Sequence, residues 1–203
     1  MEPTLIVGDQ IIITKFAYGY TRVTAPWIHG RVLARAPERG DVAVFKLPRD
    51  GRTNFIKRVI GLPGDRVQMK GGVLWLNGRQ IPRETLPSVW IPSAHGFTRT
   101  VARIRETLPN GRQYVTYDYG ADAVGDNTDL FIVPAGHYFV IGDNRDDSLD
   151  SRFSRMVGTG FVPAENLIGR AELILLSWSP GASLRRPETW FRETRFGRVI
   201  YGP

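Results

Sequence analysis

Lys57 lies in the short apolar segment NFIKRVIG, residues 54–61, whose β-branched and aromatic residues predict a strand. Side chains alternate across a strand, so Phe55, Lys57 and Val59 share one face and Arg58 lies on the other. An amine buried between apolar neighbours has a lowered pKa and can act as a neutral general base at pH 7. The alternative is that Lys57 only runs its stem along apolar surface and keeps its ammonium group in water.

A second candidate is the segment GDNRDDSLDSRF, residues 142–153, which holds four Asp, two Ser and two Arg. An EF-hand calcium loop needs Gly at its sixth position and Glu at its twelfth, and neither Asp143 nor Asp146 as first residue meets this. We therefore predict a turn-rich loop whose carboxylates pair with arginines. Asp150 and Arg152 share a side if the segment is extended, and Ser148 is then placed to bond a neighbouring amine. The alternative is a polar surface loop.

Composition excludes several kinds of site. The sequence has no Cys, so disulfides, thiol nucleophiles and Cys-ligated zinc are excluded. Its three His, at positions 29, 95 and 137, lack the spacing of metal ligands, and we predict neither a metal nor a cofactor. The net charge of +7 favours polyanions such as nucleic acid or an anionic membrane surface. Because no nucleic-acid-binding motif accompanies this charge, we predict no nucleic-acid partner.

The pattern along the chain predicts a mainly β protein. No run of 18 apolar residues could span a bilayer, and helical periodicity is scarce apart from a short stretch at 187–192. Asn77-Gly78 predicts a tight hairpin, and Asn110-Gly111 a turn before a further strand. Seven segments are short, apolar and bounded by turn residues, and these are 9–19, 40–47, 54–61, 71–81, 112–119, 137–143 and 169–178.

We expect a core built from two separate parts of the chain. Residues 1–79 form its first part and residues 137–180 its second, while residues 80–136 form an inserted β-rich subdomain. The tail, residues 181–203, mixes Arg with aromatic residues and either docks on the domain or lies at a membrane surface, of which we favour docking.

Five segments in this order resemble the type I signal peptidases, the membrane-bound serine proteases that cut leader peptides from exported proteins. The segments are MEPTLIVGDQIIITKFAYG (1–19), ERGDVAVF (38–45), FIKRVIGLPGD (55–65), GDNRDDSLDSR (142–152) and GFVPAENLIGRA (160–171). Each segment alone is a weak signal, but five in the right order make chance an inadequate explanation.

The resemblance implies a signal-peptidase-like β-sheet core and a Ser–Lys dyad. Lys57 is then the general base, and Ser148 is the hydroxyl that orients its amine. Gly142 lies where the backbone must come close to the site, while Asp150 and Arg152 form the ion pair that braces the loop. Shallow pockets for small residues at the cut site are implied for Met1, Leu5, Ile11, Phe55 and Ile56.

The resemblance also implies partners and a location. The substrate is the signal-peptide region of exported preproteins, bound extended beside a strand. The expected location is the bacterial inner membrane, with the catalytic domain on its periplasmic side. The oligomeric state is left open.

The nucleophilic Ser of this family is expected directly before Met1, with a membrane anchor further upstream, so residues 1–203 alone are expected to be inactive. Three explanations stay open: a start codon assigned too late, a chain shortened on purpose, and a natural truncation. We favour the first.

Three other classes of protein compete with a peptidase. A catalytically dead, peptide-binding homologue would begin at Met1. A self-cleaving repressor would need a DNA-binding domain and a cleavable linker, which the sequence lacks. A basic nucleic-acid binder would show strongly salt-dependent DNA binding.

Overall fold

The computed structural model describes residues 1–21, 25, 27, 32–92, 98–120, 122–177 and 197–200. The short helix expected at 187–192 lies outside these residues, as do His29, His95 and all of the tail but 197–200.

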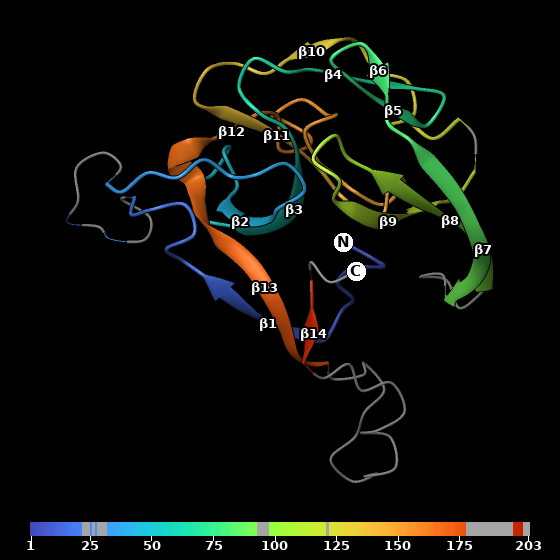
Figure 1. The fold of residues 1–203 in the computed structure, drawn as a ribbon, viewed down its shortest axis with the longest axis horizontal. Helices are drawn as coiled ribbons and strands as arrows, with labels where there is room; N and C mark the ends of the chain where they lie inside the picture. Colours follow the sequence, from blue (N-terminus) through green and yellow to red (C-terminus); the bar gives the residue numbers. More distant parts are fainter. Residues whose placement is uncertain are drawn as a thin grey trace, which may run out of the picture.

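Antiparallel strands make up nearly all of the described secondary structure, as the sequence predicted. The main sheet has seven strands in the order β1-β13-β2-β3-β11-β12, with β14 paired to β13 (Figure 1). Their bounds are β1 Asp9–Thr14, β2 Val42–Lys46, β3 Asn54–Gly61, β11 His137–Ile141, β12 Val162–Pro163, β13 Leu167–Ser177 and β14 Arg198–Val199. A 3₁₀ turn, η1 Ala164–Asn166, leads into β13.

Two smaller sheets complete the fold. One has the order β10-β4-β5-β6, and the other has the order β7-β8-β9. In Figure 1, β7 and β8 form a long arm and β9 is their strand nearest the main sheet. The bounds are β4 Arg66–Lys70, β5 Val73–Leu76, β6 Arg79–Gln80, β7 Arg83–Pro92, β8 Thr98–Thr107, β9 Gln113–Asp118 and β10 Phe131–Ile132.

The strands of the expected insertion therefore belong to two sheets. The boundary expected between residues 79 and 80 falls inside β6, and β10 returns from the far end of the insertion to pair with β4. The division of the chain into domains stays a prediction.

The predicted Asn77-Gly78 hairpin joins β5 to β6. Both residues have positive φ, +52° and +77°, which is the backbone of the primed hairpin turns. The side chain of Asn77 accepts a hydrogen bond from the Arg66 amide and donates one to Asp65, so it also fastens the start of β4.

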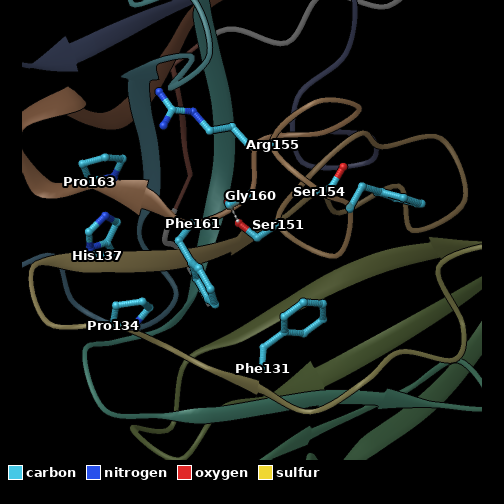
Figure 2. Close-up of a pocket in the computed structure, with 10 residues that line it drawn as sticks. Phe131, Pro134, His137, Ser151, Ser154, Arg155, Gly160, Phe161 and Pro163 are labelled. Atoms are coloured by element: carbon cyan, nitrogen blue, oxygen red, sulfur yellow. Dashed lines mark hydrogen bonds between the residues drawn. The ribbon is translucent and has the colours of Figure 1, made fainter.

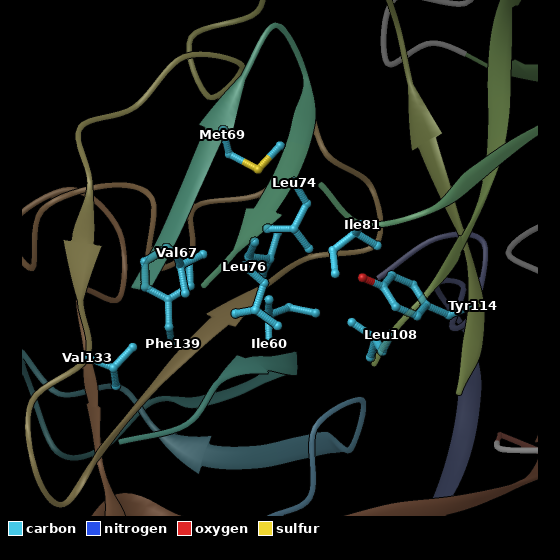
Figure 3. Packing of buried hydrophobic residues seen from close by; sticks show 11 residues of the cluster. Ile60, Val67, Met69, Leu74, Leu76, Ile81, Leu108, Tyr114, Val133 and Phe139 are labelled. Atoms are coloured by element: carbon cyan, nitrogen blue, oxygen red, sulfur yellow. The ribbon is translucent and has the colours of Figure 1, made fainter. Parts of the chain in front are cut away.

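One buried cluster joins all three sheets. Ile60 of β3 and Phe139 of β11 pack against Met69 and Leu74 of the β4–β6 sheet (Figure 3). Tyr114 of β9 lies at one end of the same cluster in Figure 3. The smaller sheets therefore share a core with the main sheet.

Gly61 ends β3 where the chain must leave the main sheet for β4. A Cβ at this position would lie 2.8 Å from Phe139 Cβ and 2.9 Å from side-chain atoms of Val133 and Val67. Only glycine fits here, and its absent side chain leaves room for Phe139, its partner across the β3–β11 pair, and for Val133 and Val67.

Candidate active site

Lys57 projects from β3, where it pairs with Ala43 of β2. Its Nζ donates a hydrogen bond of 2.8 Å to Ser148 Oγ, which comes from the 142–152 loop 91 residues away. Burial lowers the pKa of the Lys57 amine below its usual value of 10.5. The geometry favours a half-buried amine with a hydrogen-bond partner over a lysine that only reaches into solvent.

Charged groups around Lys57 act in both directions on its pKa. Burial has the largest effect and lowers the pKa. The carboxylates of Asp150, Asp143 and Asp147 raise it, and the guanidinium of Arg152 lowers it. The net direction is downward, so neutral amine is available at lower pH than for a solvated lysine.

Gly142 lets the loop approach the amine. A Cβ on Gly142 would overlap the Ser148 hydroxyl and stand 3.4 Å from Lys57 Nζ. The Gly142 amide also donates a 2.9 Å hydrogen bond to Asp150 Oδ2. Any larger residue would displace the hydroxyl that contacts the amine.

Asp150 and Arg152 form the predicted ion pair, with both side chains fully buried. Arg152 Nε lies 2.9 Å from Asp150 Oδ1 and Nη2 lies 3.0 Å from Oδ2. Burial alone would raise the pKa of Asp150, but the guanidinium of Arg152 lowers it overall. The segment is a series of turns rather than extended, so the pair closes across a turn in which the Arg152 amide also donates to Asp150.

A second buried ion pair lies beside the first and was missed from the sequence. Arg58 donates from Nε to Asp143 Oδ1 at 2.8 Å and from Nη2 to Oδ2 at 2.6 Å. Thr4 donates its hydroxyl to the same carboxylate, which fastens the N-terminal segment to the loop. The available signals were a charged residue inside an apolar strand and a carboxylate next to the required glycine.

Met1 lies close to Lys57. The pKa of the Met1 amino group is lowered, first by burial and then by the positive charge of Lys57. The Leu5 amide donates to the Met1 carbonyl at 3.1 Å, which closes a turn between the two residues.

The five residues expected to line substrate pockets divide between two apolar clusters. Met1, Leu5, Ile11 and Ile56 belong to one, and Phe55 belongs to the other with residues such as Val59. Leu5 is only 7% exposed. Their role as pocket residues stays a prediction.

A cavity of about 340 Å³ opens elsewhere, and neither Lys57 nor Ser148 lines it (Figure 2). Ser151 in its wall donates to the Gly160 carbonyl at 2.6 Å and accepts from the Val140 amide at 3.0 Å. Its hydroxyl is thus occupied by structural bonds. The lining residues are Phe131, Pro134, His137, Ser151, Phe153, Ser154, Arg155, Gly160, Phe161 and Pro163.

Within the described part of the chain, no group of three or more His, Asp or Glu side chains is arranged to hold a metal ion. Nor does that part contain a helix with the length and apolar character needed to cross a membrane.

The matching family model and the similar sequences agree on one family. The model of "Signal peptidase, peptidase S26" matches residues 1–178. The signal peptidase I of Rickettsia felis is 44% identical, and that of Rickettsia akari 38% identical, each over 98% of this chain and 80% of the relative. A crystal structure of a signal peptidase I from Enterococcus faecalis V583 matches with a TM-score of 0.38 and 26% identity, covering 67% of this chain and 97% of that one.

Proposed function

The chain belongs to the signal peptidase family, peptidase S26, and from this premise we propose that it is the endopeptidase that removes signal peptides from exported preproteins. The family and its signal peptidase I homologues support this peptidase activity. The observation that carries the mechanism is the half-buried Lys57 amine, which lies 2.8 Å from Ser148 and has a lowered pKa.

Lys57 is the general base in this proposal. Its neutral Nζ accepts the proton of a serine hydroxyl, and the oxygen attacks the scissile carbonyl of the preprotein. The resulting ammonium group returns the proton to the leaving amine. Water then hydrolyses the acyl-enzyme, with Lys57 again as the base.

We assign the nucleophile to a serine joined to the Met1 nitrogen. The packing of Met1 and of Ile56, the neighbour of Lys57 in β3, against one apolar cluster supports this assignment. The family resemblance of residues 1–19 to the segment that follows the nucleophile supports it as well.

The loop residues hold the base in place. Ser148 fixes the direction of Nζ, and Gly142 provides the close approach that this contact needs. Asp150 and Arg152 brace the loop through their buried ion pair. Their roles are positional, because the proton transfer itself needs only the amine and the hydroxyl.

The substrate binds extended beside a strand, with small side chains at the cut site in pockets lined by Met1, Leu5, Ile11, Phe55 and Ile56. The homologues are bacterial signal peptidases, and we place the enzyme at the bacterial inner membrane with its catalytic domain on the periplasmic side.

The first test uses the chain with Ser added directly before Met1 and a preprotein with an Ala-x-Ala cut site. We expect cleavage at that site and a loss on the order of a million-fold when the added Ser is replaced by Ala, as for other activated nucleophiles. Lys57→Ala should abolish cleavage and leave the fold, measured by circular dichroism, intact.

Lys70→Ala is the matched control. Lys70 is an exposed lysine on β4 whose Nζ lies 4.7 Å from the Trp75 ring centre, on a different sheet from Lys57. The Lys70→Ala protein should cleave the substrate at the parent rate. Cleavage by the Lys57→Ala protein at the parent rate would contradict the dyad.

A further inference from the structure

The β7–β9 sheet is bonded through its backbone to the loop that carries Ser148. The Tyr117 amide of β9 donates to the Asp143 carbonyl at 2.9 Å, and the Arg145 amide donates to the Tyr117 carbonyl at 2.9 Å. Asn144 between them donates its side chain to the hydroxyl of Tyr119 at 2.6 Å. The loop thus extends the β7–β9 sheet next to β9.

A buried ion pair joins β8 to the same loop. Arg145 Nη2 lies 2.5 Å from Glu106 Oε2, and the two side chains are 5% and 3% exposed. The Tyr114 hydroxyl donates to the same carboxylate at 2.6 Å. Although burial by itself would lower the pKa of Arg145, the carboxylate of Glu106 raises it overall. The guanidinium therefore stays charged and depends on Glu106 for its partner.

Tyr114 also contacts the strand that carries the base. The guanidinium carbon of Arg58 lies 4.4 Å from the centre of the Tyr114 ring, in cation–π geometry. Arg58 follows Lys57 in β3 and holds Asp143, the residue after Gly142. Glu106 thus contacts the loop that carries Ser148, and Tyr114 contacts β3, the strand that carries Lys57.

A series of contacts connects Arg145 with the amine of Lys57. The Arg145 carbonyl accepts from Arg152 Nη2, and Arg152 pairs with Asp150. The Ser148 hydroxyl helps to lower the pKa of Asp150, and it accepts a 2.8 Å hydrogen bond from Lys57 Nζ. These contacts give a route by which a shift of Arg145 would reach Ser148.

We propose that Glu106 and Tyr114 are positioning residues for the peptidase reaction, which hold the 142–152 loop and Arg58 so that Ser148 stays on Lys57. This inference rests on the proposed function, and it gives the β7–β9 sheet a part in it. Neither residue touches the reacting atoms. Glu106 acts through Arg145, since removing its charge leaves a buried guanidinium without its counter-ion.

The test substitutes Glu106→Gln, which keeps the shape of the side chain and removes its charge, in the protein with Ser before Met1. We expect kcat to fall by roughly ten- to a hundred-fold, as for a small misplacement of a catalytic group, while KM for a signal-peptide substrate stays nearly constant. Glu84→Gln is the matched control. Glu84 forms an exposed ion pair with Arg105 on the same sheet, at 2.6 Å, and this variant should keep the parent kcat.

A second readout does not depend on cleavage. The sequence has four lysines, so the Lys57 side-chain signal in NMR can be assigned with one substitution and titrated. The charged groups facing Lys57 are Asp143, Asp147, Asp150 and Arg152, since the nitrogen of Met1 is a peptide nitrogen in the protein with Ser before it. Because burial is the main cause of its lowered pKa, a displaced loop that admits water should raise the pKa in Glu106→Gln and not in Glu84→Gln.

The outcomes separate the two proposals. Suppose that the parent cleaves and that Glu106→Gln matches Glu84→Gln in both kcat and Lys57 pKa. The positioning role of Glu106 is then wrong, even if the melting temperature of Glu106→Gln falls. If the parent does not cleave, the proposed function fails, and the NMR titration still decides whether Glu106 positions the loop. Should Glu106→Gln not fold, Tyr114→Phe removes one bond to Glu106 and keeps the ring over Arg58, and the same two readouts apply.

Discussion

The protonation state of Lys57 sets the pH dependence of the proposed reaction. The amine accepts a proton only when neutral, so the cleavage rate rises with pH until the Lys57 pKa is passed. Because burial lowers that pKa, we expect the midpoint of the kcat/KM profile to lie below 10.5. A pH series on the protein with Ser before Met1 measures it. A midpoint at or above 10.5 would mean that the amine is solvated during the reaction.

In the proposed reaction, the hydroxyl of Ser148 fixes the direction of that amine through its 2.8 Å hydrogen bond. We expect Ser148→Ala to lower kcat by roughly ten- to a thousand-fold, which is the range for removing one orienting hydrogen bond in a site of this kind. Ser154→Ala, a change at an exposed serine in the same part of the chain, is the control and should cleave normally. Equal cleavage rates for the two variants would mean that Ser148 does not orient the amine of Lys57.

Sequence reasoning identified five residues that the structure brings together, Lys57, Ser148, Gly142, Asp150 and Arg152. They stand in distinctive motifs, which is why they could be found. The partners Arg58 with Asp143, and Arg145 with Glu106, were missed because each pair is far apart in sequence. Only the pairing of strands reveals that such charges are buried together.

At the scale of elements, the turn from β3 to β4 depends on Asp65. Its carboxylate accepts hydrogen bonds from Arg39 at 2.7 Å, Asn77 at 2.8 Å and the Leu62 amide at 2.6 Å. Burial alone would raise the pKa of Asp65, but these bonds lower it overall. A carboxylate of this kind stabilises the fold at pH values above its unfolded pKa of about 3.9, and the contribution is lost as pH falls toward the folded pKa.

We therefore expect Asp65→Asn to lower the free energy of unfolding at pH 7 by about 1 to 3 kcal/mol, as for a buried acceptor that loses charged partners. The difference from the parent should shrink near pH 3. Urea unfolding at both pH values measures it, with Asp129→Asn as the control at an exposed aspartate. A difference that stays constant between pH 7 and pH 3 would show that the ionised form of Asp65 is not what stabilises the turn.

The strands that sequence reasoning found are those with a clear apolar pattern. β3 matches its predicted bounds, and β2, β5, β9, β11 and β13 lie within or close to theirs. β8 was missed because arginines and threonines interrupt its apolar residues. β10, β12 and β14 have two residues each, too few for any periodicity to be visible.

For the molecule as a whole, the expected insertion behaves as part of one core. Leu108 and Tyr114 belong to the same buried cluster as Ile60 of β3 and Phe139 of β11. The Pro-rich and polar composition of residues 80–136 led us to expect an inserted subdomain, and composition cannot show that β9 and the 142–152 loop are neighbours. The division of the chain into domains stays a prediction.

We expect this joining to be visible in hydrogen exchange. The Tyr117 amide, bonded to the Asp143 carbonyl, should be protected nearly as strongly as amides in the centre of β11. The Gly111 amide, in the turn between β8 and β9, serves as the reference for an amide outside the strands. Fast exchange at Tyr117 together with slow exchange in β11 would mean that the β7–β9 sheet opens independently of the core.

Whether a positive charge at the described site belongs to an arginine or a lysine determines whether an acylating reagent can neutralise it. Arg58, Arg145 and Arg152 carry guanidinium groups, which reagents that acylate amines do not modify. Burial keeps the hydroxyl of Tyr114 protonated, since its pKa is raised well above 10.0. Amine-directed acylating reagents can therefore neutralise Lys57 and leave the three guanidinium groups untouched. Such a reagent would also modify the other three lysines, but at this site it would remove the proposed base while the supporting ion pairs of arginine stay in place.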